Sequence, residues 1–222
     1  MRFPLLTPIM LAFVLAAGCT KNSEEGGTNR VNGSIHVVAG QQNGNVDTVN
    51  GAISIDEKAT FGAADTVNGD IFIGAHATGT SAKTVNGNIT LDSGARISGE
   101  IASVNGLLTL HDGADVMGPL GNINGGISLT NAHAAQGVVT VNGDISILGT
   151  SKVEGGLRVK TLSVGVLSYD KSEPRIIIGP GAAVQGELKF ERKVKLYVSD
   201  KATIGPVSGA TPIAFSGDTP PP

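Results

Sequence analysis

The chain of 222 residues is 40% hydrophobic, 16% charged and 4% aromatic, contains 32 glycines and one cysteine, and has a formal net charge of −3. This hydrophobic fraction excludes a disordered chain, and because the glycines follow no strict three-residue period, collagen is excluded too. The slightly negative net charge gives no indication of a nucleic-acid-binding protein, and a single cysteine forms no internal disulfide. Abundant Gly, Val and Ile with few aromatic residues favour a repetitive β structure.

Residues 1–18 have the pattern of a signal peptide, with an apolar run from Leu5 to Ala17 that is too short for a comfortable membrane span. The run ends in LAAGC and resembles the bacterial lipobox, in which Cys19 becomes the lipid-modified first residue of the mature protein. Thr20 in place of Asp implies outer-membrane sorting, by analogy with lipoproteins that this segment resembles. We therefore expect a lipid-anchored outer-membrane protein, with residues 19–30 as a flexible tether.

The body of the chain is a repeat of 18 or 19 residues. Asn-Gly recurs at Asn32, Asn50, Asn68, Asn86, Asn105, Asn124 and Asn142, usually within the pattern V-N-G-x-I-x-I. Apolar residues also recur about six positions apart, as at Val49, Ile55 and Phe61, and we expect these residues to point inward. No helix matches these periods. Asn-Gly favours β-hairpins as well, but a hairpin stack would alternate two kinds of turn, and here one turn recurs.

These periods predict an all-β fold, a single-stranded parallel β-helix of triangular coils with about 18 residues each, stacked about 4.8 Å apart. Regular coils are expected over 31–153, irregular coils over 154–205, and a Pro/Gly-rich tail or cap over 206–222. The rod would be about 45 Å long. The handedness of parallel crossovers favours a right-handed helix, although strict six-residue spacing is also typical of left-handed ones.

The corners and faces of the coils follow from the same pattern. Gly and Asn permit the positive φ angles expected at corners, and the seven asparagines of the Asn-Gly pairs can stack as a hydrogen-bonded ladder. Strand alternation places the residue between the two aliphatic positions of each motif outside. These outward residues are His36, Ser54, Phe72, Thr90, Thr109, Ser128 and Ser146.

The VNG repeats behind a signal sequence resemble a bacterial adhesin-like family of secreted β-solenoids with no assigned activity. The G-A-x-V-x-G-x-L segments at 113–120 and 181–188 resemble bactofilins, which are polymer-forming scaffold proteins. The resemblance implies a non-catalytic solenoid and, for bactofilins, end-to-end assembly. A lipid anchor and a C-terminal tail depart from the bactofilin pattern and would hinder free filament growth.

The sequence predicts no catalytic residue, metal site or cofactor. The segment HDGAD at 111–115 holds an imidazole and two carboxylates, which could serve acid–base chemistry or a metal, but Asp and Gly are also expected at a corner turn. Hexapeptide acyltransferases share the six-residue period but need a CoA donor, which an extracytoplasmic protein lacks. Solenoid polysaccharide lyases have longer coils with long loops. The basic cluster at 189–195 is either a solvated strand face or a contact for an anionic surface.

The sequence therefore favours a non-enzymatic, lipid-anchored envelope solenoid with a structural, scaffold or adhesin-like role. The alternatives are a glycan- or envelope-protein-binding module and a polysaccharide-active enzyme. The expected partners are the membrane, through the N-terminal lipid, together with a second copy of the chain or an envelope glycan or protein; nucleic acid is not expected. The specific ligand, polymerisation and the periplasmic or surface orientation stay open.

Overall fold

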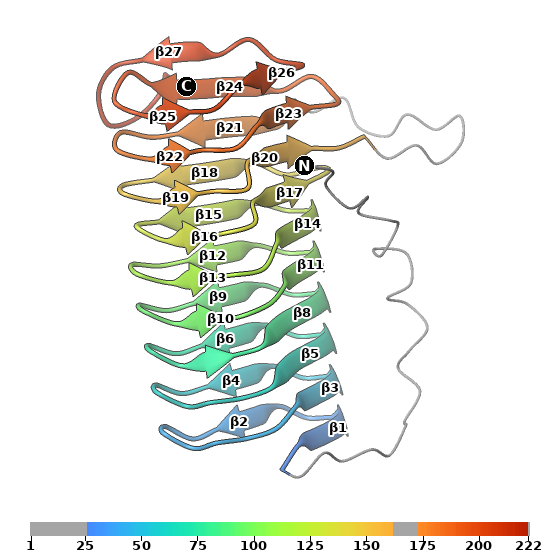
Figure 1. Ribbon diagram of the computed structural model, residues 1–222. Helices are drawn as coiled ribbons and strands as arrows, with labels where there is room; N and C mark the ends of the chain where they lie inside the picture. Colours follow the sequence, from blue (N-terminus) through green and yellow to red (C-terminus); the bar gives the residue numbers. More distant parts are fainter. Residues whose placement is uncertain (1–25, 162–172, 222) are drawn as a thin grey trace, which may run out of the picture.

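The computed structural model describes residues 26–161 and 173–221, and in these ranges every regular element is a β-strand (Figure 1). Three parallel sheets stack into a β-solenoid of about nine turns with about 19 residues per turn. The predicted parallel β-helix is therefore confirmed. The signal peptide, Cys19 and most of the tether lie outside the described residues.

Sheet A contains ten parallel strands: β1 (Thr28–Asn32), β3 (Val46–Asn50), β5 (Ala63–Asn68), β8 (Ser81–Asn86), β11 (Ile101–Asn105), β14 (Leu120–Asn124), β17 (Val138–Thr140), β20 (Leu157–Val159), β23 (Leu188–Phe190) and β26 (Val207–Ser208). Sheet B also has ten: β2 (Ile35–Val37), β4 (Ile53–Ile55), β6 (Ile71–Ile73), β9 (Ile89–Leu91), β12 (Leu108–Leu110), β15 (Ile127–Thr130), β18 (Ile145–Leu148), β21 (Arg175–Ile178), β24 (Lys195–Ser199) and β27 (Ile213–Phe215). The seven strands of sheet C are short: β7 (Thr78–Gly79), β10 (Arg96–Ile97), β13 (Asp115–Val116), β16 (His133–Ala134), β19 (Lys152–Val153), β22 (Ala183–Val184) and β25 (Thr203–Ile204).

The solenoid extends beyond the expected boundaries at both ends. Strand β1 pairs with β3 from Thr28 onward, so the first coil begins before Val31 and includes the end of the expected tether. Strands β26 and β27 pair with β23 and β24, so residues 207–215 form a last coil on the stack, in line with the cap of the two alternatives, tail or cap. Its Phe215 side chain is buried, which gives that coil its own contact with the core.

The irregular second part keeps the same three sheets. Ile127 of β15 pairs with Ile145 of β18, as the 18-residue period requires, whereas Ile145 pairs with Ile176 of β21, 31 positions further along the chain. The sequence period is lost here because one coil contains an insertion, while the stack itself continues. With about 4.8 Å between neighbouring strands, the first and last of ten strands lie about 43 Å apart.

The core is a narrow column of aliphatic side chains. In the sheet B strands from β2 to β21 both aliphatic residues are buried, as at Ile53 and Ile55, and the residue between them faces outward, as predicted. The last two strands depart from this pattern, since Tyr197 of β24 is buried and Ile213 of β27 is exposed. Gly79, an apparent gap in the apolar pattern, has a structural role: a Cβ atom at this position would lie 2.2 Å from the ring of the buried Phe61 one coil below. The core therefore accommodates the ring of Phe61 because the next coil supplies a glycine.

One prediction about the core was wrong. The valine of the VNG motif does not point inward: Val49, Val67 and Val85 are partly exposed, and the preceding Thr48 and Thr66 are 4% and 3% exposed. Within a sheet A strand the alternation runs from buried Val46 to buried Thr48, which leaves Val49 on the outer surface. The chain then turns at Asn-Gly into sheet B, so a spacing counted across this corner does not report which face a residue occupies.

Candidate functional surfaces of the solenoid

The seven predicted asparagines form a continuous hydrogen-bonded ladder along the corner between sheets A and B. The side-chain Nδ2 of each asparagine donates to Oδ1 of the asparagine one coil earlier, at distances from 2.8 to 3.2 Å. The ladder runs from Asn32 to Asn142, and the amide oxygen of Asn142 accepts a hydrogen bond from Nη1 of Arg192. This polar column is exposed, so its role is to join successive coils and set their register.

A second polar column lies inside the same corner, and the sequence pattern had not suggested it. Thr48 Oγ1 donates to the carbonyl oxygen of Gly33 at 3.1 Å, and Thr66 and Thr84 repeat this bond to Gly51 and Gly69 at 3.0 Å. Each hydroxyl satisfies a carbonyl in the coil below. In the sequence, this inner column corresponds to a Thr or Ser two positions before most of the motif asparagines. The Val-Asn-Gly pattern does not include this position, so it did not predict the column.

The glycine of each Asn-Gly pair serves close backbone stacking more than a special turn angle. Gly33, Gly106 and Gly125 have φ of 108°, 157° and 132°, as expected for corners, but Gly51, Gly69, Gly87 and Gly143 do not have positive φ. None of the motif asparagines has positive φ. A Cβ atom at Gly69 would lie 2.0 Å from the carbonyl oxygen of Gly51 in the coil below. Glycine is needed because stacked backbones leave no volume for a side chain.

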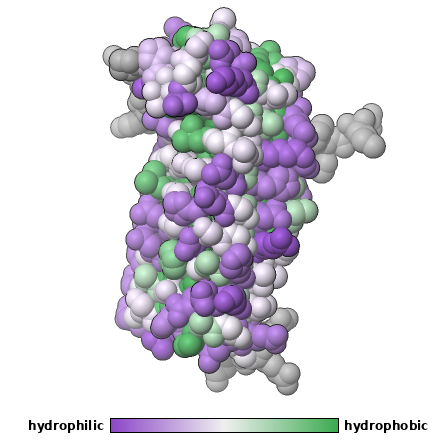
Figure 2. All heavy atoms as spheres, turned by 90° about the vertical axis from the view of Figure 1, so that its left-hand side faces the viewer, coloured by the Kyte–Doolittle hydropathy of each residue, from purple (hydrophilic) through white to green (hydrophobic). Residues whose placement is uncertain are grey.

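Positive φ angles occur mainly at a different corner, between sheets B and C. Gly94, Gly113 and Gly149 adopt φ of 69°, 73° and 62° there, and Lys58 and His76 adopt the same conformation at 57°. Figure 2 shows this side of the rod as a mosaic of hydrophilic and hydrophobic patches.

The structure separates the HDGAD segment into two environments. His111 and Asp112 lie exposed in this corner turn, where Asp112 accepts a hydrogen bond from Asn131 Nδ2 at 2.9 Å. Asp115 instead begins β13 and faces His133 of the next coil, with 2.7 Å between Asp115 Oδ1 and His133 Nδ1. The segment therefore does not form one acid–base cluster.

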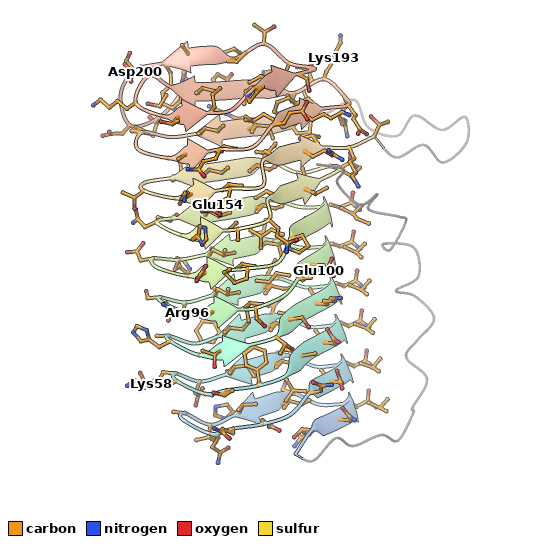
Figure 3. All side chains as sticks on the ribbon, in the orientation of Figure 1. Lys58, Arg96, Glu100, Glu154, Lys193 and Asp200 are labelled. Carbon is orange, nitrogen blue, oxygen red and sulfur yellow. The ribbon has the colours of Figure 1, made fainter. Side chains whose placement is uncertain are left out.

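Asp115 belongs to a charged row on the outside of sheet C. His133 Nε2 lies 3.5 Å from Glu154 Oε1, and Lys152 Nζ donates to the same carboxylate at 2.5 Å. The ammonium of Lys152, and to a smaller extent His133, lowers the pKa of the exposed Glu154. The carboxylates of Asp115 and Glu154 thus lie beside His133 and Lys152, which suits mutual stabilisation; Figure 3 labels Glu154 on this face. Among residues 26–161 and 173–221, no group of three His, Cys, Asp or Glu side chains could hold a metal ion.

An acidic row occupies the first coils of sheet A. Asp47, Asp65 and Lys83 are in register on neighbouring strands, and Lys83 Nζ lies 2.9 Å from Glu100 Oε2. Burial, followed by the charge of Asp47, raises the pKa of Asp65 to about 6, although Lys83 acts in the opposite direction. Burial also raises the pKa of Asp47.

Basic residues gather on the last coils. Arg158 and Lys189 are in register on the outside of sheet A, and Arg175 and Lys195 are in register at the start of sheet B strands. The guanidinium of Arg175 lies 4.9 Å from the centre of the Tyr197 ring. The predicted basic cluster at 189–195 therefore divides between two faces, with Lys189 and Lys193 exposed.

Comparisons with known proteins give no match: no family model, no curated protein and no solved structure resembles the chain detectably. The described part of the chain contains no helix with the length and hydropathy of a membrane-spanning segment.

Proposed function

We propose that the protein is a lipid-anchored, non-enzymatic rod of the bacterial outer membrane, with a structural, scaffold or adhesin-like role. The observation that carries the proposal is the stack from β1 to β27, in which sheets A and B join the described coils into one body and an asparagine ladder joins the first seven of them. Strand β1 begins at Thr28, shortly after Cys19 in the sequence, so a lipid on Cys19 would hold the rod by one end.

The resemblance of two segments to bactofilins, which are polymer-forming scaffold proteins, supports a scaffold role, and the resemblance of the VNG repeats to adhesin-like solenoids supports a secreted one. A scaffold would form end-to-end oligomers whose length grows with protein concentration. A binding module would be retained saturably on purified envelope glycans or an envelope protein. An enzyme of the polysaccharide-active class would lose turnover in Asp112→Ala, whose carboxylate sits in the exposed HDGAD turn.

The anchor has a direct test. In cells grown with radiolabelled palmitate, the full chain should carry the label and fractionate with the outer membrane, because several acyl chains give stable anchoring. Cys19→Ala removes the thiolate that accepts the lipid, so the label should be lost. Thr20→Ser is the matched control, since it keeps both the cysteine and a non-acidic residue after it. Label retained on Cys19→Ala would overturn the lipoprotein assignment.

A further inference from the structure

The outer face of sheet A carries an apolar stripe. Because the motif valine points outward, Val49, Val67, Val85, Val104 and Ile123 form one aliphatic column on successive coils, each residue partly exposed. The hydrophobic effect disfavours a water-facing column of this kind, and contiguous apolar patches on soluble surfaces commonly mark interaction sites. The stripe covers the coils from β3 to β14; at the equivalent position of the next coil Val141 is buried, and Lys160 and Glu191 follow it.

The neighbouring column on the same face is acidic at one end and basic at the other. The strand register places in one line Asp47, Asp65, Lys83, Ala102, Gly121, Val139, Arg158 and Lys189. Two carboxylates stand at one end and two cations at the other. Between them lie Lys83, which pairs with Glu100 of its own chain, and three small or aliphatic residues. Neither Arg158 nor Lys189 forms a salt bridge with a described residue.

We propose that two copies of this chain pair face to face through sheet A in antiparallel orientation. The two copies are related by a two-fold axis that runs parallel to the strands and passes between β11 and β14. Each strand of sheet A then faces the strand at the same distance from the axis in the second copy. Asp47 then faces Lys189 of the second copy, Asp65 faces Arg158, and Ala102 faces Gly121. In the adjacent column Val104 faces Ile123, and Val85 lies over the coil of the buried Val141. The interface has an apolar centre and charged ends, the usual anatomy of a specific protein interface.

Charge and area both favour this occupant and this orientation. A parallel pair would place Asp65 against Asp65 and Arg158 against Arg158, and such like-charge contacts are strongly unfavourable. The antiparallel arrangement replaces both repulsions with attraction and gives the partly buried Asp65, crowded by Asp47, an opposite charge. The strands of sheet A shorten from five or six residues in β1 to β14 to two or three in β17 to β26. A face about 43 Å long and about four residues wide offers about 600 Å² per partner, at the lower end of the range for specific interfaces.

The antiparallel pair has a consequence for the proposed function. If each rod is anchored near β1, the two anchors lie at opposite ends of the pair, so the dimer would join two facing membrane surfaces. This consequence rests on the proposed lipid anchor, whereas the pairing itself does not.

The pairing can be tested by charge exchange on full-length protein in density-matched detergent, with the dimer dissociation constant measured by sedimentation equilibrium. Asp65→Arg and Arg158→Asp should each raise the dissociation constant at least tenfold, because each opposes like charges at two symmetry-related contacts. The double variant Asp65→Arg/Arg158→Asp should return it to within about threefold of the wild type. Lys58→Glu, on the corner opposite sheet A (Figure 3), should leave it unchanged.

A cross-linking experiment separates orientation from folding defects. Disulfides should form in mixtures of Asp47→Cys and Lys189→Cys chains, and should be rare within either pool alone. The two positions are seven coils apart in one chain, so a bond between them must join two copies. Monomeric wild-type protein at 100 μM and low salt, unrestored pairing in a folded double variant, or cross-linking mainly within the Asp47→Cys pool would each overturn the proposal. Loss of palmitate label on the wild type would refute the anchor alone and leave the pairing standing.

Discussion

The glycine that follows each ladder asparagine is fixed by the volume of the stacked backbone. A Cβ atom at Gly69 would meet the Gly51 carbonyl oxygen at 2.0 Å, and this oxygen is held in place by a hydrogen bond from Thr66 Oγ1. We predict that Gly69→Ala lowers the free energy of unfolding by about 3 kcal/mol, the upper range for overpacking. Chemical denaturation measures this loss.

Gly40→Ala is the matched control for this substitution. Gly40 has a φ of 70°, and a Cβ atom added to it would meet no other atom within 4 Å, so alanine there introduces conformational strain without a clash. This variant should lose only about 1 kcal/mol. Equal losses in Gly69→Ala and Gly40→Ala would mean that turn conformation, and not stacking, selects the Asn-Gly glycine.

Asp65 makes stability depend on pH in a defined direction. Its pKa in the folded protein is about 6, above its ordinary value of 3.8, so the folded state binds the proton more tightly than the unfolded state. The resulting stabilisation is complete below about pH 4 and is lost as the pH rises through 6. Asp65→Asn should therefore be more stable than the wild type at pH 8 and nearly equal to it at pH 4.

The measurement is the melting temperature of Asp65→Asn and of the wild type from pH 4 to pH 8. Because the other groups titrate in both proteins, their effects cancel in the difference between the two melting temperatures. Asp70→Asn, which alters an exposed carboxylate on a neighbouring corner, serves as the control and should show no such pH-dependent difference. If the melting temperatures of Asp65→Asn and the wild type differed by the same amount from pH 4 to pH 8, Asp65 would not be the source of the pH dependence.

At the scale of the element, the sequence predicted correctly the features that recur on one face of every coil. It placed wrongly the motif valine, which lies next to a corner between two sheets. The asparagine spacing predicted the ladder, and the aliphatic pair of each sheet B strand was placed correctly, because both features repeat every coil on a single face. The motif valine was placed wrongly because the six-residue count crosses the Asn-Gly corner, where the chain changes sheets. The Asp115–His133 contact was also missed, although its 18-residue separation equals one coil.

The insertion after β20 could not be placed from the sequence, because it removes the period on which the prediction depends. The structure shows how the two parts are joined at this point. Arg192, between β23 and β24, reaches back to the carbonyl oxygen of Val141 and the side chain of Asn142, the last asparagine of the ladder. Its guanidinium thus continues the polar column across the coil that contains the insertion.

We predict that Arg192→Ala destabilises the C-terminal coils by about 1–3 kcal/mol, the range for losing hydrogen bonds to a charged donor. Hydrogen exchange should show faster exchange in β20 to β27, with little change in β3 to β8. Arg192→Lys should recover only part of the protection, because one ammonium replaces a planar donor that reaches two acceptors. The neighbouring exposed Lys193→Ala should behave as the wild type. A uniform loss of hydrogen-exchange protection along the rod would show that Arg192 does not stabilise the C-terminal coils specifically.

The whole molecule is quasi-one-dimensional, since each coil contacts mainly the coils above and below it. Stability in such a stack is approximately a sum over coils and their interfaces, so the unit of tolerated change should be one full coil. Deletion of residues 69–86 joins Asn68 to Gly87, which keeps the Asn-Gly corner, both polar columns and the alternation of every remaining strand. We predict a folded rod that is shorter by about 4.8 Å.

Deletion of residues 69–77 is the matched control, because half a coil shifts the later strands onto other faces and puts aliphatic residues on the surface. This variant should not give a cooperative melt, whereas the full-coil deletion should melt cooperatively at slightly reduced temperature. Circular dichroism follows folding, and small-angle scattering measures the maximum dimension. If both deletions unfold alike, the coils do not act as independent stacking units, and the repeat reflects a fold that is cooperative over its whole length.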